Sequence, residues 1–212
     1  MNSKDHFKQD YLNYWKKRTT NPLDGSKVAD SNIISYYVGE MGISKEDKII
    51  DIGCGYGRAF NAIYQYTNRV VGIDISIDML RNASQYPYDC LIESGAEKIP
   101  ITDNFFNHIL IWGVYDVLNQ EESLVEFNRI LKNSGKILIT GKNYHYDSSD
   151  ENAFIAERNA KLNKFPNHFT DISKLRKVIS EYGFNIIKAY TFRLRGNFGE
   201  NKFCDITKKQ YN

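Results

Sequence analysis

The stretch with the clearest chemical content is a set of three glycines at alternate positions, Gly53, Gly55 and Gly57. These glycines follow a short apolar run, residues 48–52, which is typical of a buried parallel strand. Glycine lets the backbone turn sharply and approach a ligand without an intervening Cβ atom. A strand, a glycine turn and a following helix therefore predict a nucleotide-type pocket at the carboxyl end of a sheet.

Neighbouring residues narrow the choice of ligand. Arg58 stands where the dinucleotide fingerprint G-x-G-x-x-G has its third glycine, and no G-K-[ST] follows, so a P-loop is excluded. Asp51, at the end of the first predicted strand, would repel a pyrophosphate and favours a cationic ligand. Asp74 closes the next predicted strand, at the distance where a carboxylate binds ribose hydroxyls. A positively charged nucleoside is expected, and S-adenosylmethionine, with its sulfonium and amino groups, fits.

Four segments then carry a resemblance to a known family. They are D-I-G-C-G-Y-G, G-I-D-I-S, A-E-K-I-P-I-T-D-N-F-F-N and R-I-L-K-N-S-G-K-I-L-I-T, in this order within residues 48–140. With them the chain resembles the class I S-adenosylmethionine-dependent methyltransferases, most closely the small-molecule group called type 11. The resemblance implies an α/β, Rossmann-like doubly wound fold with a seven-stranded sheet, mostly parallel with an antiparallel edge pair, and helices on both faces. It also implies a methyltransferase (EC 2.1.1) that uses S-adenosyl-L-methionine.

The chain is expected to form a single domain of residues 1–212 in four parts. These are an N-terminal helical lid (1–47), a cofactor-binding core (48–140), a substrate-cap insertion (141–170) and a closing helix with strands (171–212). Strands are predicted at 48–52, 70–75, 90–93, 108–112, 136–140, 184–194 and 202–207. Helices are predicted at 5–18, 28–41, 58–66, 76–84, 121–131, 151–162 and 171–182. Asn133, Ser134 and Gly135 are expected to cap the helix that precedes them.

The residues expected to bind the cofactor follow the ends of the predicted strands or stand in the leading helix. In the family, the position of Met79 lies against the adenine. The family often has an acidic residue at Gly95, so the adenine contacts here are expected to fall on Ala96 and Glu97. The leading helix carries an aromatic stripe that either packs on the domain or covers the sulfonium. The full set is Tyr11, Tyr14, Trp15, Asp51, Gly53, Cys54, Gly55, Gly57, Arg58, Asp74, Ile75, Met79, Gly95, Ala96, Glu97, Trp112, Gly113 and Val114.

Methyl transfer from a sulfonium is an in-line displacement, so the protein mainly supplies position and electrostatics. A hydroxyl acceptor would also need a base, for which His145, Tyr115 and Asp116 are the candidates. The alternative for His145 is a structural or solvated role. Asp147, Asp150 and Glu151 could bind a metal ion, but an exposed loop explains them better, and no metal is expected.

The amino-acid composition and charge argue against nucleic-acid and membrane partners. The chain has 212 residues, 42% of them hydrophobic, and a net charge of +2, which gives no electrostatic case for nucleic acid. Its three cysteines lack C-x-x-C spacing, its first residues are polar, and no apolar run reaches the roughly 20 residues that span a bilayer. The expected protein is cytoplasmic, a monomer or homodimer without a membrane partner, and acts on a small-molecule substrate such as a sugar or metabolite hydroxyl.

Three alternatives remain open at this point. A nucleic-acid or protein methyltransferase is one, although the Asn/Asp-Pro-Pro-aromatic motif of amino-methylating nucleic-acid enzymes is replaced by Trp112-Gly113-Val114-Tyr115. An oxidoreductase that binds NAD is the second, and the glycine spacing and Asp51 argue against it. A protein that binds S-adenosylmethionine without catalysis is the third.

Overall fold

The structure is a computed structural model of the chain, and it describes residues 13, 31–142, 155, 158–159, 161–162, 170–192 and 202–209. The strands of its sheet lie in the order β3-β2-β1-β4-β5-β7-β6. Their bounds are β1 Ile49–Ile52, β2 Val70–Asp74, β3 Cys90–Glu93, β4 Phe106–Trp112, β5 Leu131–Lys142, β6 Phe184–Phe192 and β7 Lys202–Lys209.

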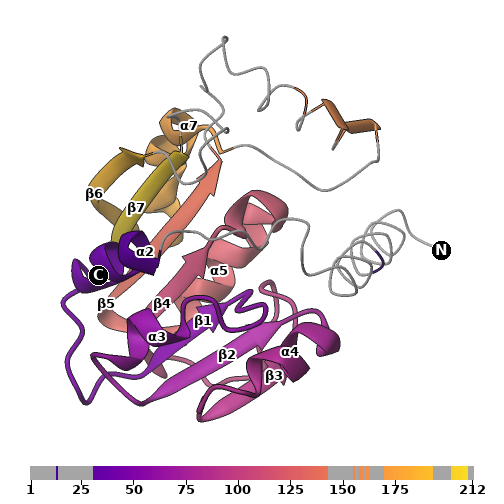
Figure 1. Cartoon of the computed structure of the whole chain (residues 1–212). Helices are drawn as coiled ribbons and strands as arrows, with labels where there is room; N and C mark the ends of the chain where they lie inside the picture. Colours follow the sequence, from indigo (N-terminus) through magenta and orange to yellow (C-terminus); the bar gives the residue numbers. More distant parts are fainter. Residues whose placement is uncertain are drawn as a thin grey trace.

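The first five strands run parallel, and β7 pairs antiparallel with both β5 and β6 (Figure 1). The chain moves outward from β1 to β2 and β3, and then returns to the other side of β1 to form β4. This reversal is the topological switch point at which open α/β sheets bind ligands. The Rossmann-like α/β architecture expected from the sequence is confirmed.

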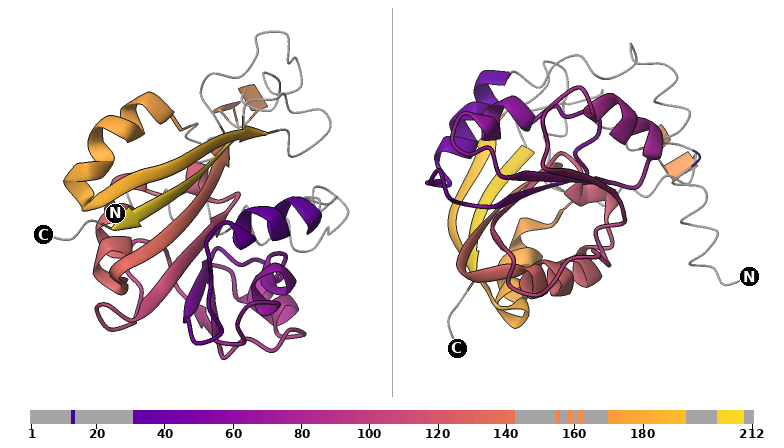
Figure 2. Two further views of the ribbon diagram at one scale, coloured as in Figure 1. Left: turned by 90° about the vertical axis from the view of Figure 1, so that its left-hand side faces the viewer. Right: turned by 90° about the horizontal axis from the view of Figure 1, so that it is seen from below.

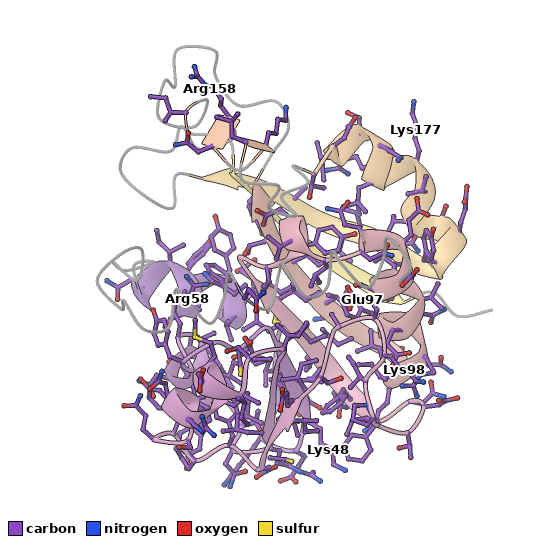
Figure 3. All side chains as sticks on the ribbon, turned by 90° about the vertical axis from the view of Figure 1, so that its right-hand side faces the viewer. Lys48, Arg58, Glu97, Lys98, Arg158 and Lys177 are labelled. Carbon is purple, nitrogen blue, oxygen red and sulfur yellow. The ribbon has the colours of Figure 1, made fainter. Side chains whose placement is uncertain are left out.

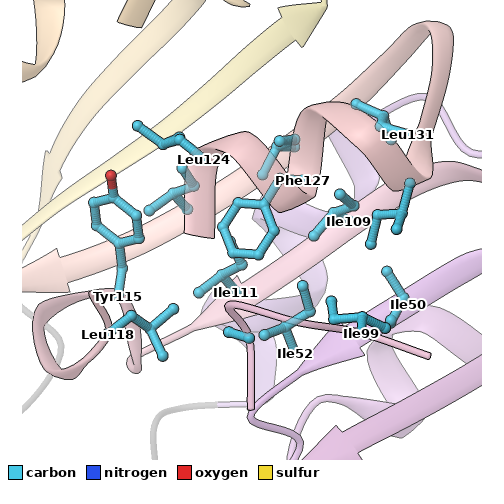
Figure 4. Packing of buried hydrophobic residues seen from close by; sticks show 14 of the residues in the cluster. Ile50, Ile52, Ile99, Ile109, Ile111, Tyr115, Leu118, Leu124, Phe127 and Leu131 are labelled. Atoms are coloured by element: carbon cyan, nitrogen blue, oxygen red, sulfur yellow. The ribbon is translucent and has the colours of Figure 1, made fainter. Parts of the chain in front are cut away.

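Successive side chains of β1 point to opposite faces of the sheet, and each face is covered by its own layer of the core. Ile49 faces a cluster that includes Ile34 and Val38 of α2 and Phe60 of α3, whereas Ile50 faces the opposite cluster. Figure 4 shows that second cluster, where α5 places its apolar side chains over β1 and β4. Figure 2 shows α7 and α2 on opposite sides of the sheet. The helix bounds are α2 Ser31–Gly39, α3 Phe60–Tyr64, α4 Ile77–Ala83, α5 Gln120–Ile130 and α7 Ile172–Val178, with 3-10 turns η1 Tyr115–Val117 and η2 Ile179–Tyr182.

One predicted helix end is wrong and another is confirmed. Helix α5 ends at Ile130 without a glycine cap, because Leu131 already adopts an extended conformation and pairs with Phe106 as the first residue of β5. Ser134, with a φ of 63°, therefore lies within β5. Further along the chain, Gly183 ends η2 in the left-handed conformation, with a φ of 80°, as expected.

Among the residues that the structure describes, no helix is both long and apolar enough to cross a membrane.

Candidate functional site

The candidate site lies at the carboxyl ends of the parallel strands β1, β2, β3 and β4. The glycine loop follows β1, Asp74 ends β2, and Gly113 follows β4. Ser94 follows β3 and donates its backbone N–H to the Asp74 carbonyl at 3.0 Å. Figure 3 places Arg58 toward this end of the strands and Lys48 toward the opposite end. The sheet therefore gathers segments that are far apart in the sequence.

The three glycines of the loop have different tasks, although all have positive φ values, of 66° at Gly53, 56° at Gly55 and 87° at Gly57. A Cβ atom on Gly53 would lie 2.7 Å from the Val114 side chain, and one on Gly57 would lie 2.5 Å from the Tyr86 ring. These two glycines allow close packing. A Cβ on Gly55 would meet nothing within 4 Å, so open space lies beside the backbone there, as a bound ligand requires.

Asp74 holds the loop in place. Its carboxylate accepts hydrogen bonds from the backbone N–H of Gly55 and of Ser76, both at 2.9 Å. Burial raises the pKa of Asp74, and the backbone donors Ser76, Gly55 and Ile75 oppose that shift. A carboxylate has about four acceptor positions, so hydrogen-bonding capacity remains for a further ligand.

Asp51 is a second carboxylate beneath the loop, and unlike the half-buried Asp74 it is only 2% exposed. The hydroxyl of Tyr88 donates to its Oδ2 atom at 3.0 Å. Burial raises the pKa of Asp51 to about 7, while the Tyr88 hydrogen bond and the charge of Arg58 oppose the rise and the charge of Asp74 adds to it. Two neighbouring carboxylates in a low-dielectric site favour a cationic ligand.

Arg58 joins the glycine loop to the end of β4. Its Nη2 atom donates to the carbonyl of Trp112 at 2.9 Å. A Cβ on Gly113 would lie 3.1 Å from that same Nη2, and the Gly113 φ is 74°. The Gly113 N–H in turn donates to the Thr140 hydroxyl at 2.7 Å, so β1, β4 and β5 are tied together at the site.

The loop after β3 borders another side of the candidate site. Ala96 is 4% exposed, and the carboxylate of Glu97 accepts a hydrogen bond from the Asn119 backbone at 3.1 Å, immediately before α5. Met79 and Ile75, at the start of α4 and just before it, are half-buried. The remaining candidate, Cys54, is buried and donates its backbone N–H to the Ile73 carbonyl at 2.9 Å. The structure thus places these predicted cofactor residues around the carboxyl ends of the strands.

The structure corrects one predicted catalytic residue. Tyr115 is fully buried in the core, and Figure 4 shows its ring packed near Leu118 and Leu124. Burial raises the pKa of its hydroxyl, which has no hydrogen-bond partner among the described groups. A group that cannot reach an acceptor and resists deprotonation cannot serve as the base. Asp116 is buried as well, at 3% exposed, and its role as the base stays a prediction.

Several predictions fall outside the residues that the structure describes, and they stay predictions. They concern Tyr11, Tyr14 and Trp15 of the leading segment, the candidate base His145, and the acidic residues Asp147, Asp150 and Glu151. Within the described part of the chain, no group of three or more His, Cys, Asp or Glu side chains could hold a metal ion.

Tyr88 and Thr140 were not among the predicted site residues, and both contact site residues from elsewhere in the chain. Thr140 carries no recognisable pattern. Tyr88 had an indirect signal, because a glycine inside a strand, here Gly72 of β2, often marks a place where another group approaches closely.

Comparison with known proteins agrees with this geometry. Residues 50–139 match a family model described as "Methyltransferase domain". An uncharacterized protein of Methanocaldococcus jannaschii, MJ1252, is 31% identical over 104 residues, or 49% of this chain and 40% of that protein. A demethylmenaquinone methyltransferase of Staphylococcus aureus is 31% identical over 107 residues, or 47% of this chain and 44% of the relative. The chain thus spans less than half the length of these relatives.

A solved structure has the same fold at low sequence identity. It is the Burkholderia thailandensis 1,6-didemethyltoxoflavin-N1-methyltransferase with bound 1,6-didemethyltoxoflavin and S-adenosylhomocysteine. It superposes with a TM-score of 0.78 at 11% identity, and the alignment covers 100% of this chain and 92% of the other.

The buried charge of Asp51 predicts a pH-dependent stability. Its folded pKa of about 7 lies above the unfolded value of about 3.9, so the stability that protonated Asp51 contributes is lost as the pH rises to about 7. We expect Asp51→Asn, which keeps an acceptor for Tyr88, to raise the free energy of unfolding by about 1–3 kcal/mol at pH 8 and to change little at pH 4. Urea unfolding of the ligand-free protein measures this difference.

The matched control is Asp89→Asn, because Asp89 is an exposed carboxylate before β3. It should leave stability unchanged at both pH values. If Asp51→Asn were no more stable than the original chain at pH 8, the proposed penalty for the buried carboxylate would be absent.

Proposed function

We propose that the chain is a class I S-adenosylmethionine-dependent methyltransferase, in keeping with the match of residues 50–139 to a methyltransferase-domain family model, and that it transfers a methyl group from S-adenosylmethionine to a small-molecule acceptor. The observation that carries the proposal is the open space beside Gly55, with the carboxylate of Asp74 fixed next to it. These residues fit a nucleoside bound at the carboxyl ends of β1 and β2. Asp51 adds a buried negative charge that suits a sulfonium or an amino group.

The described residues would divide the work of cofactor binding. Asp74 would accept the ribose hydroxyls, and Gly55 would let the backbone approach the ligand. Asp51 would attract the cationic end of the cofactor. The half-buried Met79 and the loop at Ala96 and Glu97 would lie against the adenine, while Trp112, Gly113 and Val114 would flank the reacting centre.

S-adenosylmethionine supplies an already activated methyl group, so the chain need only bind, orient and exclude water. The acceptor atom must be held roughly 3 Å from the methyl carbon, opposite the sulfur. A hydroxyl acceptor would benefit from a base, worth about 10²–10⁴ in rate, and Asp116 and His145 are the proposed groups. An amine that binds in its neutral form would need no such base.

A small-molecule acceptor is supported by two of the similar proteins. The S. aureus relative is named for demethylmenaquinone, and the B. thailandensis structure holds 1,6-didemethyltoxoflavin. The chain's net charge of +2 offers no strong attraction to nucleic acid. We therefore propose a metabolite acceptor, with a sugar or metabolite hydroxyl as the first class to screen.

Cofactor choice is the first test. Calorimetry with S-adenosylhomocysteine and, separately, with NAD should show binding of the first and none of the second, because the G-x-G-x-G loop lacks the dinucleotide spacing. Binding of NAD alone would overturn the proposed function.

The role of Asp74 can be tested with Asp74→Asn, which preserves the size of the side chain and removes its charge. Hydrogen bonds to charged groups contribute about 1.5–3 kcal/mol, so we expect the affinity for S-adenosylhomocysteine to fall at least tenfold. The control is Glu93→Ala, because Glu93 pairs with Asp74 in the sheet register but is exposed. An affinity of Asp74→Asn within twofold of the original would show that ribose binds elsewhere.

The open space beside Gly55 predicts a separable effect on binding. Gly55→Ala places a methyl group where the described residues leave room, so the chain should still fold, with about 1–2 kcal/mol of backbone strain. The methyl group would occupy the path of the ligand, and we expect the affinity for S-adenosylhomocysteine to fall more than tenfold in calorimetry.

Gly42→Ala provides the control for backbone strain. Gly42 has a φ of 64° and precedes β1, at the opposite end of that strand from the glycine loop. The Gly42→Ala variant should lose a similar amount of stability and keep its affinity for S-adenosylhomocysteine. Equal affinities for Gly55→Ala and the original chain would mean that the ligand does not approach the backbone at Gly55.

A further inference from the structure

The ring of Tyr88 crosses β2 to reach a carboxylate on the next strand. Asp51 of β1 is paired in register with Gly72 of β2, and Tyr88 lies just before β3, beyond β2. A Cβ atom on Gly72 would lie 3.0 Å from Cε1 of the Tyr88 ring. Because β2 has a glycine at this position, the ring can pass over the strand and its hydroxyl can meet Asp51 Oδ2 at 3.0 Å.

The position of the ring is fixed by packing on several sides. Its centroid lies 4.5 Å from that of Phe60 in α3, and Tyr88 also packs against the buried cluster of Cys54, Leu80 and Ala83. The neighbouring backbone is held as well, since Tyr88 N–H donates to the Tyr86 carbonyl at 2.9 Å and Asp89 N–H donates to the Val70 carbonyl at 2.8 Å. Packing of the ring and hydrogen bonds of the backbone therefore together position the hydroxyl that meets Asp51.

The groups that face Asp51 come from three segments. The glycine loop and the start of the next helix bring Cys54 and Arg58, β2 brings Asp74, and the segment before β3 brings Tyr88. Asp74 disfavours a second negative charge, whereas Arg58 and Tyr88 favour it. Arg58 also donates to the Trp112 carbonyl, so it has a second task at the site.

We propose that Tyr88 is a positioning residue for cofactor binding, whose hydroxyl orients the Asp51 carboxylate and keeps it charged toward the cationic end of S-adenosylmethionine. The inference rests on the proposed function and extends it to a residue outside the glycine loop. Tyr88 acts through Asp51 and need not touch the cofactor itself.

The expected consequence is a pH dependence of cofactor affinity that Tyr88 controls. Burial raises the pKa of Asp51 to about 7, so this carboxylate is only partly ionised in the ligand-free protein near neutral pH. Loss of the Tyr88 hydroxyl removes a hydrogen bond that favours the ionised form, and this should raise the pKa by about one pH unit. The ionised fraction would then fall several-fold near pH 7 and change little at pH 9.

Tyr88→Phe tests the proposal, because it keeps the ring that packs on Phe60 and removes the hydroxyl alone. Calorimetry would give the dissociation constants of S-adenosylmethionine and S-adenosylhomocysteine at pH 7 and pH 9. For each ligand, the dissociation constant of Tyr88→Phe divided by that of the unsubstituted chain should be about five at pH 7 and near one at pH 9. Titration of the ligand itself cancels in this ratio because both proteins meet the same ligand.

Tyr64→Phe is the matched control. The Tyr64 ring also stacks on Phe60, with centroids 5.0 Å apart, but its side chain is 45% exposed. Its affinity ratio should be one at both pH values. A Tyr88→Phe ratio that falls at least threefold between pH 7 and pH 9 supports the proposal, and a smaller change, at any absolute affinity, overturns it.

Failure of the inference can be distinguished from failure of the proposed function. If the original chain binds neither nucleoside at pH 7 or pH 9, the proposed function is wrong, and the role of Tyr88 in cofactor binding falls with it. The carboxyl carbon resonance of Asp51 in the ligand-free protein then reports the Tyr88 contact alone. A higher pKa in Tyr88→Phe would leave that contact established, and an unchanged pKa would remove it as well.

Discussion

The site depends on one constraint: the glycine loop must be held open at a fixed place, and the carboxylate of Asp74 holds it there. A loop built from positive-φ glycines has little preference of its own for a single conformation. The Asp74 carboxylate satisfies the N–H groups of Gly55 and Ser76 together, and so joins the turn after β1 to the turn after β2. The other contacts of the loop, Gly53 with Val114 and Arg58 with Trp112, then position β4 against this pair.

The second feature of the site is that the carboxylate of Asp51 is buried. Asp51 alternates with Ile50 and Ile52, so the pleat that gives β1 two apolar residues on one face places a carboxylate on the other. A buried carboxylate lowers the stability of the ligand-free fold unless it is neutralised or hydrogen-bonded. Binding sites commonly accept such a local penalty because a desolvated charge interacts more strongly with an opposite charge. Tyr88 reduces the penalty without neutralising Asp51.

The parts of the site that depend on residues close together in the sequence could be predicted. The strand at residues 49–52, the glycine turn and Asp74 could be predicted because each depends on the preferences of neighbouring residues. The cap at Ser134 was wrong because pairing of Leu131 with Phe106 in the sheet overrides the local turn pattern. Tyr115 was wrong for a related reason, since it follows a strand that ends at the site, but the fold buries it in the cluster that also contains Leu124 and Phe127 of α5.

The ties between distant segments could not be predicted from local patterns. Tyr88 and Asp51 are 37 positions apart, and Arg58 and Trp112 are 54 positions apart. Their contacts exist only after the strand order is set. The account as a whole makes one spatial claim, that a nucleoside lies on the glycine loop with its ribose at Asp74.

A crystal structure of the chain with S-adenosylhomocysteine tests this claim most directly. The account predicts both ribose hydroxyls within about 3 Å of the Asp74 carboxylate, with the ligand alongside the backbone of Gly55. A nucleoside bound away from the carboxyl ends of β1 and β2 would contradict it.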